Sequence, residues 1–350
     1  ASEIKNYSEV KKGFTNFQNG DILFAKITPC MENGKGAIAN NMKNGIGFGS
    51  TEFYVLRPDT DKITSEWLYY LTTWKTFRKE AERNMTGSAG QKRVPKTFLE
   101  NYVVNLPDID TQKSENKILR KVDDLIFLRK QQLSKLDELV KARFVEMFGD
   151  FEFNPKEFPV YHLCELCDVG SSKRIYQEEQ SISGIPFLKV ADLNELIDTG
   201  KYSCSTFIPL ERYEQLLHKE LTPTENDILI TSRGTLGKCY IVQSDDEFYF
   251  QDGMISWLSN FSPKVSSIYI SYLFAQPYIQ KQIESLQAGS TVAYLSIAML
   301  KKINVILPPK KLQDDFATFV EHVDQQKQTV QQSLEKLELL KKALMQEYFG

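Results

Sequence analysis

Apolar side chains recur every three or four residues along two long stretches of the chain, residues 111–148 and 311–349. The first stripe comprises Leu119, Val122, Ile126, Leu133, Leu136 and Val140, and the second comprises Phe316, Val320, Val323, Val330, Leu334, Leu337 and Leu344. Arg129 interrupts the first stripe, and Lys327 and Lys341 interrupt the second. Such spacing is typical of helices in a coiled coil. It predicts two long helices that pair with each other rather than each packing only on its own sheet, over roughly 45 Å for about 30 residues.

The stretches that precede these two helices have the patterns of strands and shorter helices. Runs rich in β-branched and aromatic residues predict strands at 21–27, 51–56, 227–231 and 247–250. Helical patterns follow at about 65–82 and 267–286, then polar Gly-Ser loops at 86–93 and 288–293. A last strand is expected before a Leu-Pro pair in each half. The predicted fold class is α+β.

The same order of elements occurs twice because the sequence contains an internal repeat. Leu133, Leu136, Lys141, Ala142, Phe148 and Gly149 each match an identical residue 201 positions later. Leu106-Pro107 recurs at the same offset, and residues 21–23 recur at 227–229. Residues from about 158 to 205 have no counterpart in the first copy. We therefore predict two copies of one module, the first without its N-terminal part.

The repeat and the helical stripes together define a domain order. Residues 1–110 are predicted to form the first module and residues 111–150 a central long helix. Residues 151–310 are predicted to form the second module and residues 311–350 a distal long helix.

Charge and composition narrow the class of protein. The net charge of −3 and a pI of about 5.9 argue mildly against a general nucleic-acid coat, whose affinity comes from phosphate neutralisation. They are compatible with a sequence reader that has locally basic loops. No run approaches eighteen apolar residues, and the N-terminus has no signal-peptide h-region. Five dispersed cysteines without a secretory signal predict reduced thiols in the cytoplasm.

Several motifs superficially suggest catalysis or metal binding, and each has a simpler structural interpretation. The glycines of residues 45–49 precede a strand pattern, whereas a cofactor loop opens a helix, so a hairpin or bulge is favoured. Asp108 and Asp110 crowd one turn at a helix start, where capping explains them better than a nuclease metal site. No Asn-Pro-Pro-aromatic adenine-methylase motif occurs; residues 307–310 read LPPK.

A zinc site is the remaining metal candidate. His162, Cys164 and Cys167 supply three ligands, but a structural zinc site needs four. Buried thiols in a core strand are the favoured interpretation, and no metal is predicted.

The order of motifs in each copy resembles that of a known family. Residues 47–58 (GFGSTEFYVLRP), 67–71, 87–94 and 104–107 resemble one target recognition domain of a type I restriction-modification specificity subunit. Residues 184–188 and 226–235 (NDILITSRGT) resemble the front of a second such domain. The two long helices resemble the family's conserved regions, which form an antiparallel coiled coil. The departure from the family pattern is the truncated first domain.

The resemblance implies a subunit that catalyses nothing itself. Such a subunit reads a split, asymmetric target in double-stranded DNA and docks two methyltransferase subunits and the restriction subunits. No cofactor is expected in this chain, and S-adenosylmethionine is expected in the methyltransferase subunits.

Basic and polar loops are the candidates for DNA contact. They comprise Lys26, Ser88, Gln91, Lys92, Arg93, Lys173, Arg174, Ser232, Arg233, Thr235, Lys238, Ser290, Thr291 and Tyr294. Arg233 and Lys238 flank two glycines, which allow the backbone to approach a partner closely. Arginine can also read guanine in the major groove. The structural alternative is an ordinary set of solvated loops.

Two other classes of function stay open on the sequence. A duplicated scaffold that assembles proteins through its coiled coil fits the mild acidity, although Lys and Arg in the module loops favour a DNA reader. An enzyme with an unrecognised site is the second rival, but no group of residues with converging chemistry supports it.

Overall fold

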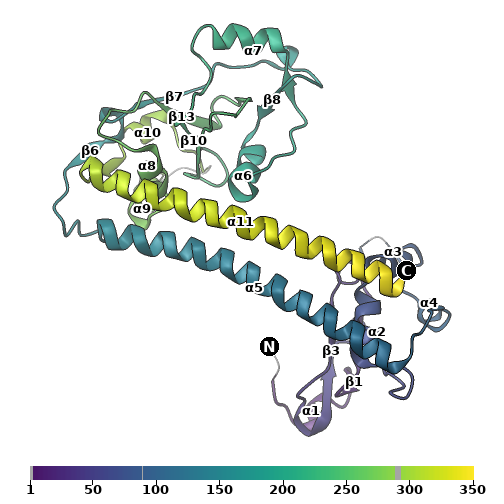
Figure 1. Ribbon diagram of the computed structural model, residues 1–350. Coiled ribbons are helices and arrows are strands. Elements are labelled where there is room, and N and C mark those ends of the chain that lie inside the picture. The colour runs from purple at the N-terminus through teal and green to yellow at the C-terminus, as the bar shows by residue number, and fades with distance from the viewer. Residues whose placement is uncertain (1–2, 89, 288–292) are drawn as a thin grey trace. The chain divides into compact units, whose positions relative to one another are not determined.

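The computed structural model describes residues 3–88, 90–287 and 293–350, and the chain divides into two compact units (Figure 1). Unit 1 consists of Ala1–Ser134 and Gln328–Gly350, and unit 2 of Lys135–Lys327. Each unit contains one module with strands and short helices, and part of each long helix, α5 (Ile109–Phe148) and α11 (Lys310–Phe349). Below, the first module means the part of unit 1 before α5, and the second module means the part of unit 2 between the two helices.

The first module is built around the central strand β2 (Ile22–Ala25). This strand pairs antiparallel with β3 (Gly36–Ile38) and β5 (Phe53–Leu56), and β1 (Thr15–Gln18) pairs with β4 (Ile46–Gly49). The helices are α1 (Tyr7–Val10), the 3₁₀ turn η1 (Lys43–Gly45), α2 (Ser65–Thr73), α3 (Lys75–Arg83) and α4 (Lys96–Glu100). The predicted helix at 65–82 is in fact two helices, because Trp74 is extended and turns the chain. This turn places Trp67 and Phe77 in the same core.

The second module has a four-stranded antiparallel sheet in the order β11-β10-β13-β7. Its strands are β7 (Asp168–Ser171), β10 (Ile228–Thr231), β11 (Cys239–Ile241) and β13 (Ile255–Ser259). A three-stranded sheet contains β8 (Ile185–Leu188), β9 (Phe207–Ile208) and β12 (Tyr249–Phe250), and β6 (Val160–His162) pairs with β14 (Asn304–Ile306). The predicted strands at 21–27, 51–56, 227–231 and 247–250 correspond to β2, β5, β10 and β12.

The last three helices of the second module follow the same order as α2, α3 and α4 of the first, and the second module has further helices before them. The helices of this module are the 3₁₀ turns η2 (Leu163–Glu165) and η3 (Gln177–Glu179), then α6 (Val190–Thr199), α7 (Leu210–Leu217), α8 (Ser267–Phe274), α9 (Pro277–Leu286) and α10 (Ile297–Lys301). The predicted single helix at 267–286 is wrong in one respect, because Pro277 starts a new helix after the extended Gln276. Proline cannot continue a helix from its interior without losing a hydrogen bond, whereas it fits the first turn.

The internal repeat is visible in strand register. In the first module Ile22 lies opposite Leu56, and in the second module Ile228 lies opposite Leu258. These pairs occupy matching positions in the two copies. The duplicated sequence therefore folds into the same central antiparallel pair in both modules.

A buried glutamine ties the start of each long helix to its own module. In unit 1, the Gln112 side chain accepts from the Thr64 backbone N–H at 2.9 Å. Its amide nitrogen donates to the Lys62 and Pro107 carbonyls, both at 2.8 Å. Gln112 is fully buried. Without these three hydrogen bonds, its polar side-chain atoms would be buried without partners, which lowers the free energy of unfolding.

Gln313 repeats this arrangement in unit 2. Its side chain accepts from the Ser266 backbone N–H at 2.9 Å and donates to the Lys264 and Pro308 carbonyls at 3.0 and 2.7 Å. Gln313 is also fully buried. The start of each long helix is therefore held to its own module by a matching set of three hydrogen bonds.

The long helices pair antiparallel, and the basic residues that interrupt their stripes form bonds across the pair. In unit 1, Arg129 Nε donates to Ser333 Oγ at 3.1 Å, and Lys341 pairs with Asp123 at 2.6 Å. In unit 2, Lys327 pairs with Asp137 at 2.5 Å. As the α5 number rises, the α11 number of its partner falls, which is the signature of antiparallel helices. The predicted helix pair is confirmed.

The last aromatic residue of each long helix packs into the module that precedes the other helix. Phe349, near the end of α11, packs against Trp67 of the first module with ring centroids 4.8 Å apart and the ring planes tilted by 51°. Phe148, at the end of α5, lies 5.0 Å from the Tyr269 ring of the second module. Each module core therefore includes a residue from the helix of the other copy, so neither copy is a self-contained domain.

Candidate nucleic-acid interface

In both modules, the chain that follows the Gly-Ser loop is bonded to the end of the central strand. In the first module, the Val94 N–H donates to the Lys26 carbonyl at 2.9 Å, and the Thr28 N–H donates to the Lys92 carbonyl at 3.0 Å. In the second, the Leu295 N–H donates to the Ser232 carbonyl at 2.9 Å. These contacts bring together residues that are more than 60 positions apart in sequence. They place residues 92–94 beside Lys26 in the first module and Leu295 beside Ser232 in the second.

The first-module loop holds its basic residues in internal contacts. Arg93 makes two bonds to the Glu52 carboxylate, each at 2.9 Å, and this pairing holds the pKa of Glu52 below its ordinary value. The Lys26 ammonium lies 4.8 Å from the centre of the Tyr54 ring, a cation–π contact. Lys92 is exposed. Ser88 and Gln91 are likewise exposed beside it.

The second-module loop presents a different set of side chains. Arg233 is exposed, and among the described residues its guanidinium has no carboxylate partner; its one polar contact is Met254 Sδ at 3.6 Å. Thr235 is exposed on the same turn, and Tyr294 lies opposite Arg233 in an isolated backbone bridge. Lys238 instead bonds both oxygens of Asp198, at 2.7 and 2.8 Å.

Two glycines shape this turn. Gly234 and Gly237 have φ angles of 74° and 76°, in the left-handed region that side chains with a Cβ rarely adopt. A Cβ on Gly237 would lie 2.8 Å from Ile283 Cδ1. The glycines thus let the chain turn tightly directly after Arg233, whose side chain is exposed.

Ser232 does not fit the predicted contact set. It is 1% exposed, and its hydroxyl lies 2.7 Å from the Ser256 hydroxyl. Ser232 directly follows β10, and every residue of that strand is buried, so both faces of the strand end are covered. The prediction that Ser232 contacts DNA is therefore wrong for its side chain, although its carbonyl holds the loop. Ser290 and Thr291 lie outside the described residues.

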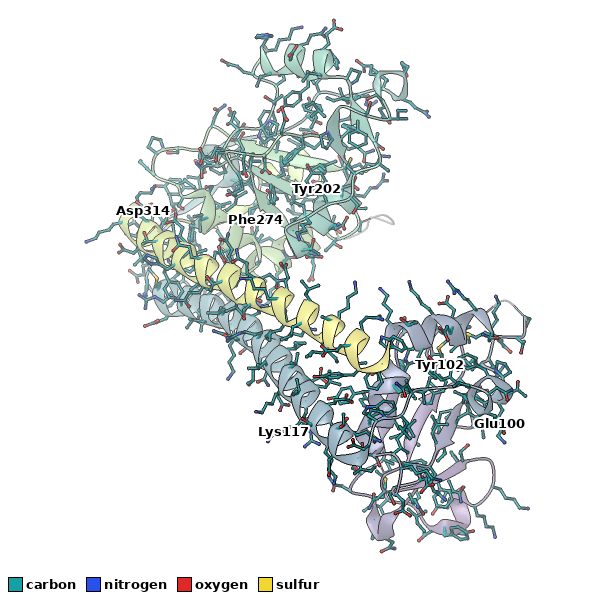
Figure 2. All side chains as sticks on the ribbon, turned by 45° about the vertical axis from the view of Figure 1, so that its right-hand side comes forward. Glu100, Tyr102, Lys117, Tyr202, Phe274 and Asp314 are labelled. Atoms are coloured by element: carbon teal, nitrogen blue, oxygen red, sulfur yellow. The ribbon has the colours of Figure 1, made fainter. Side chains whose placement is uncertain are left out.

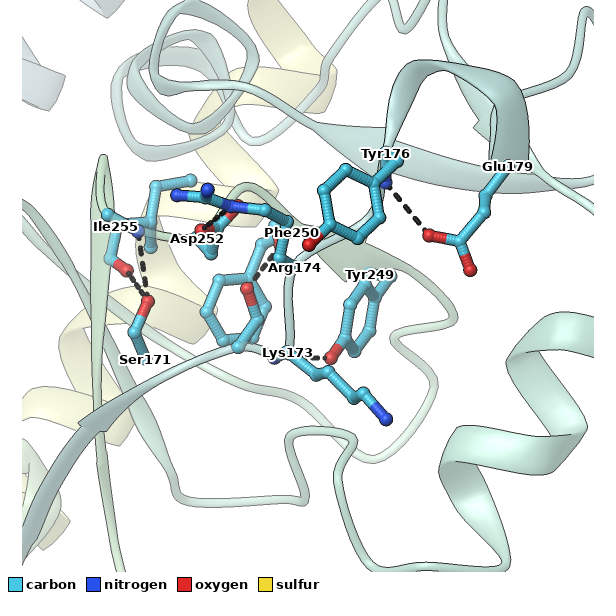
Figure 3. Close-up of polar contacts among 11 residues, drawn as sticks. Ser171, Lys173, Arg174, Tyr176, Glu179, Tyr249, Phe250, Asp252 and Ile255 are labelled. Atoms are coloured by element: carbon cyan, nitrogen blue, oxygen red, sulfur yellow. Dashed lines mark hydrogen bonds and ion pairs between the residues drawn. The ribbon is translucent and has the colours of Figure 1, made fainter.

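A third basic segment follows β7, and Figure 3 shows its polar contacts. The Lys173 backbone N–H donates to the Tyr249 hydroxyl at 2.9 Å, and Arg174 Nε donates to Asp252 at 2.8 Å. Burial raises the pKa of Tyr249 to about 12, so this hydroxyl keeps its proton at neutral pH. The Lys173 side chain extends away from the cluster (Figure 3). The backbone is thus fixed while the charged end of Lys173 stays exposed.

The sequence matches a known family over most of its length. The match covers residues 2–138 and 155–339 of the family described as type I restriction modification DNA specificity domain. The chain belongs to this family.

Individual relatives agree with the family assignment. The chain is 47% identical over 138 residues to the type I restriction enzyme EcoAI specificity subunit of Escherichia coli, covering 39% of this chain and 23% of that protein. It is 26% identical over 286 residues to the MjaVIII specificity subunit of Methanocaldococcus jannaschii, covering 75% of this chain and 65% of that protein. The alignment thus spans about a quarter of the length of the first relative.

The fold also matches a solved structure. The type I restriction-modification system S subunit from M. genitalium superposes with a TM-score of 0.58, at 16% identity, over 96% of this chain and 84% of that one. At this identity the match supports the fold. It agrees with an α+β specificity-domain architecture that has long helices.

Within this member of the specificity-domain family, the motifs that suggested other chemistry have structural roles. Residues 46–49 form strand β4 rather than leading into a helix. Asp108 accepts from the Thr111 N–H at 2.8 Å and from its hydroxyl at 3.1 Å, and these bonds lower the pKa of Asp108. The predicted helix cap is confirmed for Asp108.

The expected pair of buried thiols is only half correct. Cys167 is buried, and burial raises the pKa of its thiol to about 12. Cys164 is exposed, because residues 163–165 form the 3₁₀ turn η2 rather than a strand. None of the described helices is both long enough and apolar enough to span a membrane.

The sequence reasoning missed the acidic partners of the basic loops. Glu52, Asp198 and Asp252 hold Arg93, Lys238 and Arg174 respectively, across separations of 41, 40 and 78 residues. No local spacing could have identified these pairs. Tyr176, two residues after Arg174, is 56% exposed and is not among the predicted contact residues.

Proposed function

We propose that this chain is a DNA sequence-specificity subunit of a type I restriction-modification complex. Each module reads one part of a split, asymmetric double-stranded target. The observation that carries the proposal is the repeated loop on the end of the central strand. Among the described residues, the segment after this loop donates a matching backbone hydrogen bond to the strand end in each module, whereas the exposed side chains differ, as two different half-sites require.

Within this proposal, the contact residues fall into two groups. The first-module face consists of Lys26, Ser88, Gln91, Lys92 and Arg93. The second-module face consists of Lys173, Arg174, Arg233, Thr235, Lys238, Ser290, Thr291 and Tyr294. Arg233 is the leading candidate for a base contact because its guanidinium is exposed and no carboxylate within the described part of the chain pairs with it, and arginine can bond guanine at two atoms.

The proposal assigns protein docking to the long helices. In unit 1, α5 exposes a row of large apolar side chains on positions spaced at three or seven residues. They are Ile118, Leu125 and Leu128, with Phe127 beside them at 60% exposure. Exposed apolar rows of this size mark protein-binding surfaces. We assign two methyltransferase subunits to surfaces that include the helices, and restriction subunits to the resulting complex.

No catalytic step is assigned to this chain. S-adenosylmethionine is expected on the methyltransferase subunits, which would methylate the DNA that this chain selects. The five cysteines are unpaired, which fits the cytoplasmic setting that the proposal requires.

The decisive experiment is reconstitution. The chain is co-purified with candidate methyltransferase subunits, and methylation is mapped on a DNA library by sequencing. We expect methylation at one bipartite sequence only when all components are present, and none from the purified chain alone. Robust methylation or cleavage by the lone chain contradicts the proposal. A complex that assembles but shows no sequence preference favours the scaffold function instead.

A further inference from the structure

Three loops of the second module meet at one edge of its four-stranded sheet. The strand β10 runs antiparallel to β13, with Thr231 opposite Ile255. The strand β13 in turn runs antiparallel to β7, with Ser256 opposite Ser171. The ends of β7 and β10 therefore lie at the same edge of the sheet as the start of β13. The loops at this edge are residues 172–176, 232–238 and 251–254.

The loop of residues 251–254 is bonded to the ends of both neighbouring strands. The Ser232 N–H, directly after β10, donates to the Met254 carbonyl at 2.9 Å. The Gly253 N–H donates to Ser171 Oγ, the last residue of β7, at 3.1 Å. A polar side chain on this loop is therefore held in place before any partner binds.

The strands behind these loops belong to the core of the module. Leu229 of β10 and Ile255 of β13 are fully buried in one cluster, against which Tyr202 packs (Figure 2). Side chains supported by packed strands keep a more precise geometry than those on unsupported loops. The edge is thus a fixed platform for the side chains that its loops present.

The carboxylates that pair with basic loop residues differ in how many of their oxygens are occupied. Both oxygens of Glu52 and both oxygens of Asp198 accept from a basic side chain. Arg174 Nε donates only to Oδ2 of Asp252, at 2.8 Å (Figure 3). In the described part of the chain no donor bonds Oδ1 of Asp252, and the side chain of Asp252 is 20% exposed.

The free oxygen places a hydrogen-bond acceptor among donors. The exposed guanidinium of Arg233 lies near the same loop, with Nη1 3.6 Å from Met254 Sδ. Because Arg174 is paired with Asp252, the pair has little net charge and can approach phosphates that would repel a bare carboxylate. Gly253 is exposed, and no atom lies within 4 Å of the place that a Cβ would take, so the space beside Asp252 is open.

We propose that Asp252 is a specificity-determining residue of the second module, and that its Oδ1 accepts a hydrogen bond from the N4 amino group of a cytosine. Cytosine presents this donor in the major groove, where a carboxylate can accept from it. Arg174 is then a positioning residue, since it orients the carboxylate and neutralises its charge. This inference rests on the proposed DNA-reading function, and it adds an acidic residue to the second-module face.

The test maps methylation on a DNA library with the complex of the full chain and methyltransferase subunits. Asp252→Asn and Asp252→Ala should each reduce the preference for cytosine about tenfold at one position, in the half-site that Arg233→Ala also affects. Binding to unrelated duplexes should not weaken, because the substitution removes a negative charge and releases Arg174 to contact phosphate. If Asp252 served only the fold, specific and general binding would both fall.

A changed base tests the same contact with the original protein. N4-methylcytosine still pairs with guanine, but its methyl group replaces the amino hydrogen that points into the major groove. Placed at each cytosine of the half-site in turn, it should weaken binding of the original complex about tenfold at one position, and binding of Asp252→Ala by less than about twofold there. The scan of the original complex decides if neither Asp252 variant folds.

Asp245→Asn is the matched control, because it removes the same charge from the same module. Asp245 is exposed in the loop after β11, at the opposite edge of the sheet, so its base preferences should equal those of the original chain. Unchanged preferences at every position in both Asp252 variants overturn this inference while the proposed function stands. So does an N4-methylcytosine effect of equal size in the original complex and Asp252→Ala. The absence of any base preference in the original complex overturns both.

Discussion

Arg93 in the first module and Arg233 in the second both lie where a Gly-Ser loop meets the end of the central strand, yet their surroundings differ. Arg93 donates from Nε and Nη2 to the Glu52 carboxylate, whereas Arg233 has no carboxylate partner among the described residues. A guanidinium already paired with a carboxylate must break that pair before it can bond a base. The duplicated fold therefore places an arginine at a similar loop position in each module. The presence or absence of a neighbouring carboxylate decides which arginine is free to bond a base.

The module interiors are more alike than the surfaces. Gln112 and Gln313 make matching sets of three hydrogen bonds, and Phe349 and Phe148 fill matching positions against Trp67 and Tyr269. Interiors diverge slowly because a buried polar group without its partner, or a cavity, costs free energy directly. Loop side chains carry no such cost, so the halves of a split target reader can diverge there.

The largest difference between the two units is expected on removing the aromatic end of each long helix. Phe148 is fully buried among Phe144, Phe316 and Tyr269, so Phe148→Ala should lower the free energy of unfolding by about 3–5 kcal/mol. Phe349→Ala should cost less, because Phe349 is 8% exposed whereas Phe148 is fully buried. Urea denaturation followed by circular dichroism measures both.

Phe127→Ala is the control for this comparison, since Phe127 is exposed and should change stability by less than about 0.5 kcal/mol. Equal losses for Phe148→Ala and Phe349→Ala would show that the two module cores depend equally on the helix ends.

The anchoring glutamines should behave alike in the two copies. Gln112→Leu and Gln313→Leu each leave one buried N–H and two carbonyls without their partner, at a cost of about 2–4 kcal/mol. Urea unfolding of both variants, with the exposed Gln91→Leu as control, measures this. If the losses of unfolding free energy in the two variants differed by more than about 1.5 kcal/mol, the two glutamines would not be equivalent.

The two arginines should differ in DNA binding. In complex with methyltransferase subunits, Arg233→Ala should cost about 1–3 kcal/mol at the specific site and relax the preference at one base position. Arg93→Ala should weaken binding more evenly across sequences, because it leaves the Glu52 carboxylate uncompensated near the phosphates. Titrations against matched and single-base-changed duplexes at several salt concentrations separate these outcomes.

If Arg233 touches only phosphate, Arg233→Ala should instead reduce the salt slope by about one without changing base preference. Identical affinity, slope and preference in variant and original would remove Arg233 from the interface.

The smallest effect concerns two aspartates at matching positions. Hydrogen bonds from Arg57 hold the pKa of Asp21 below its ordinary value of 3.8, whereas burial raises the pKa of Asp227 above it. A lowered folded-state pKa contributes stability above pH 3.8 that is lost as the pH falls through the folded pKa. A raised pKa does the reverse, because ionisation then costs stability as the pH rises.

Asp21→Asn should therefore destabilise the chain more at pH 7 than at pH 3, and Asp227→Asn should destabilise it less at pH 7 than at pH 3. Urea unfolding at the two pH values gives the sign. The same pH trend for both variants would show that the two aspartates have similar surroundings, contrary to the structure.

The sequence by itself determined the repeat, the two long helices, the central strands and the family, because periodicity and motif order are local or evenly offset along the chain. Only the tertiary structure decided which basic side chains are free to contact DNA and which are paired with carboxylates. The carboxylates that hold Arg93, Lys238 and Arg174 come from distant segments, and Ser232 is buried because segments distant in sequence cover both faces of the strand end. The exchange of helix ends between modules was likewise invisible in the sequence. A stripe of apolar residues indicates that one face of a helix is buried. It does not identify the segment that covers this face, because that depends on long-range packing.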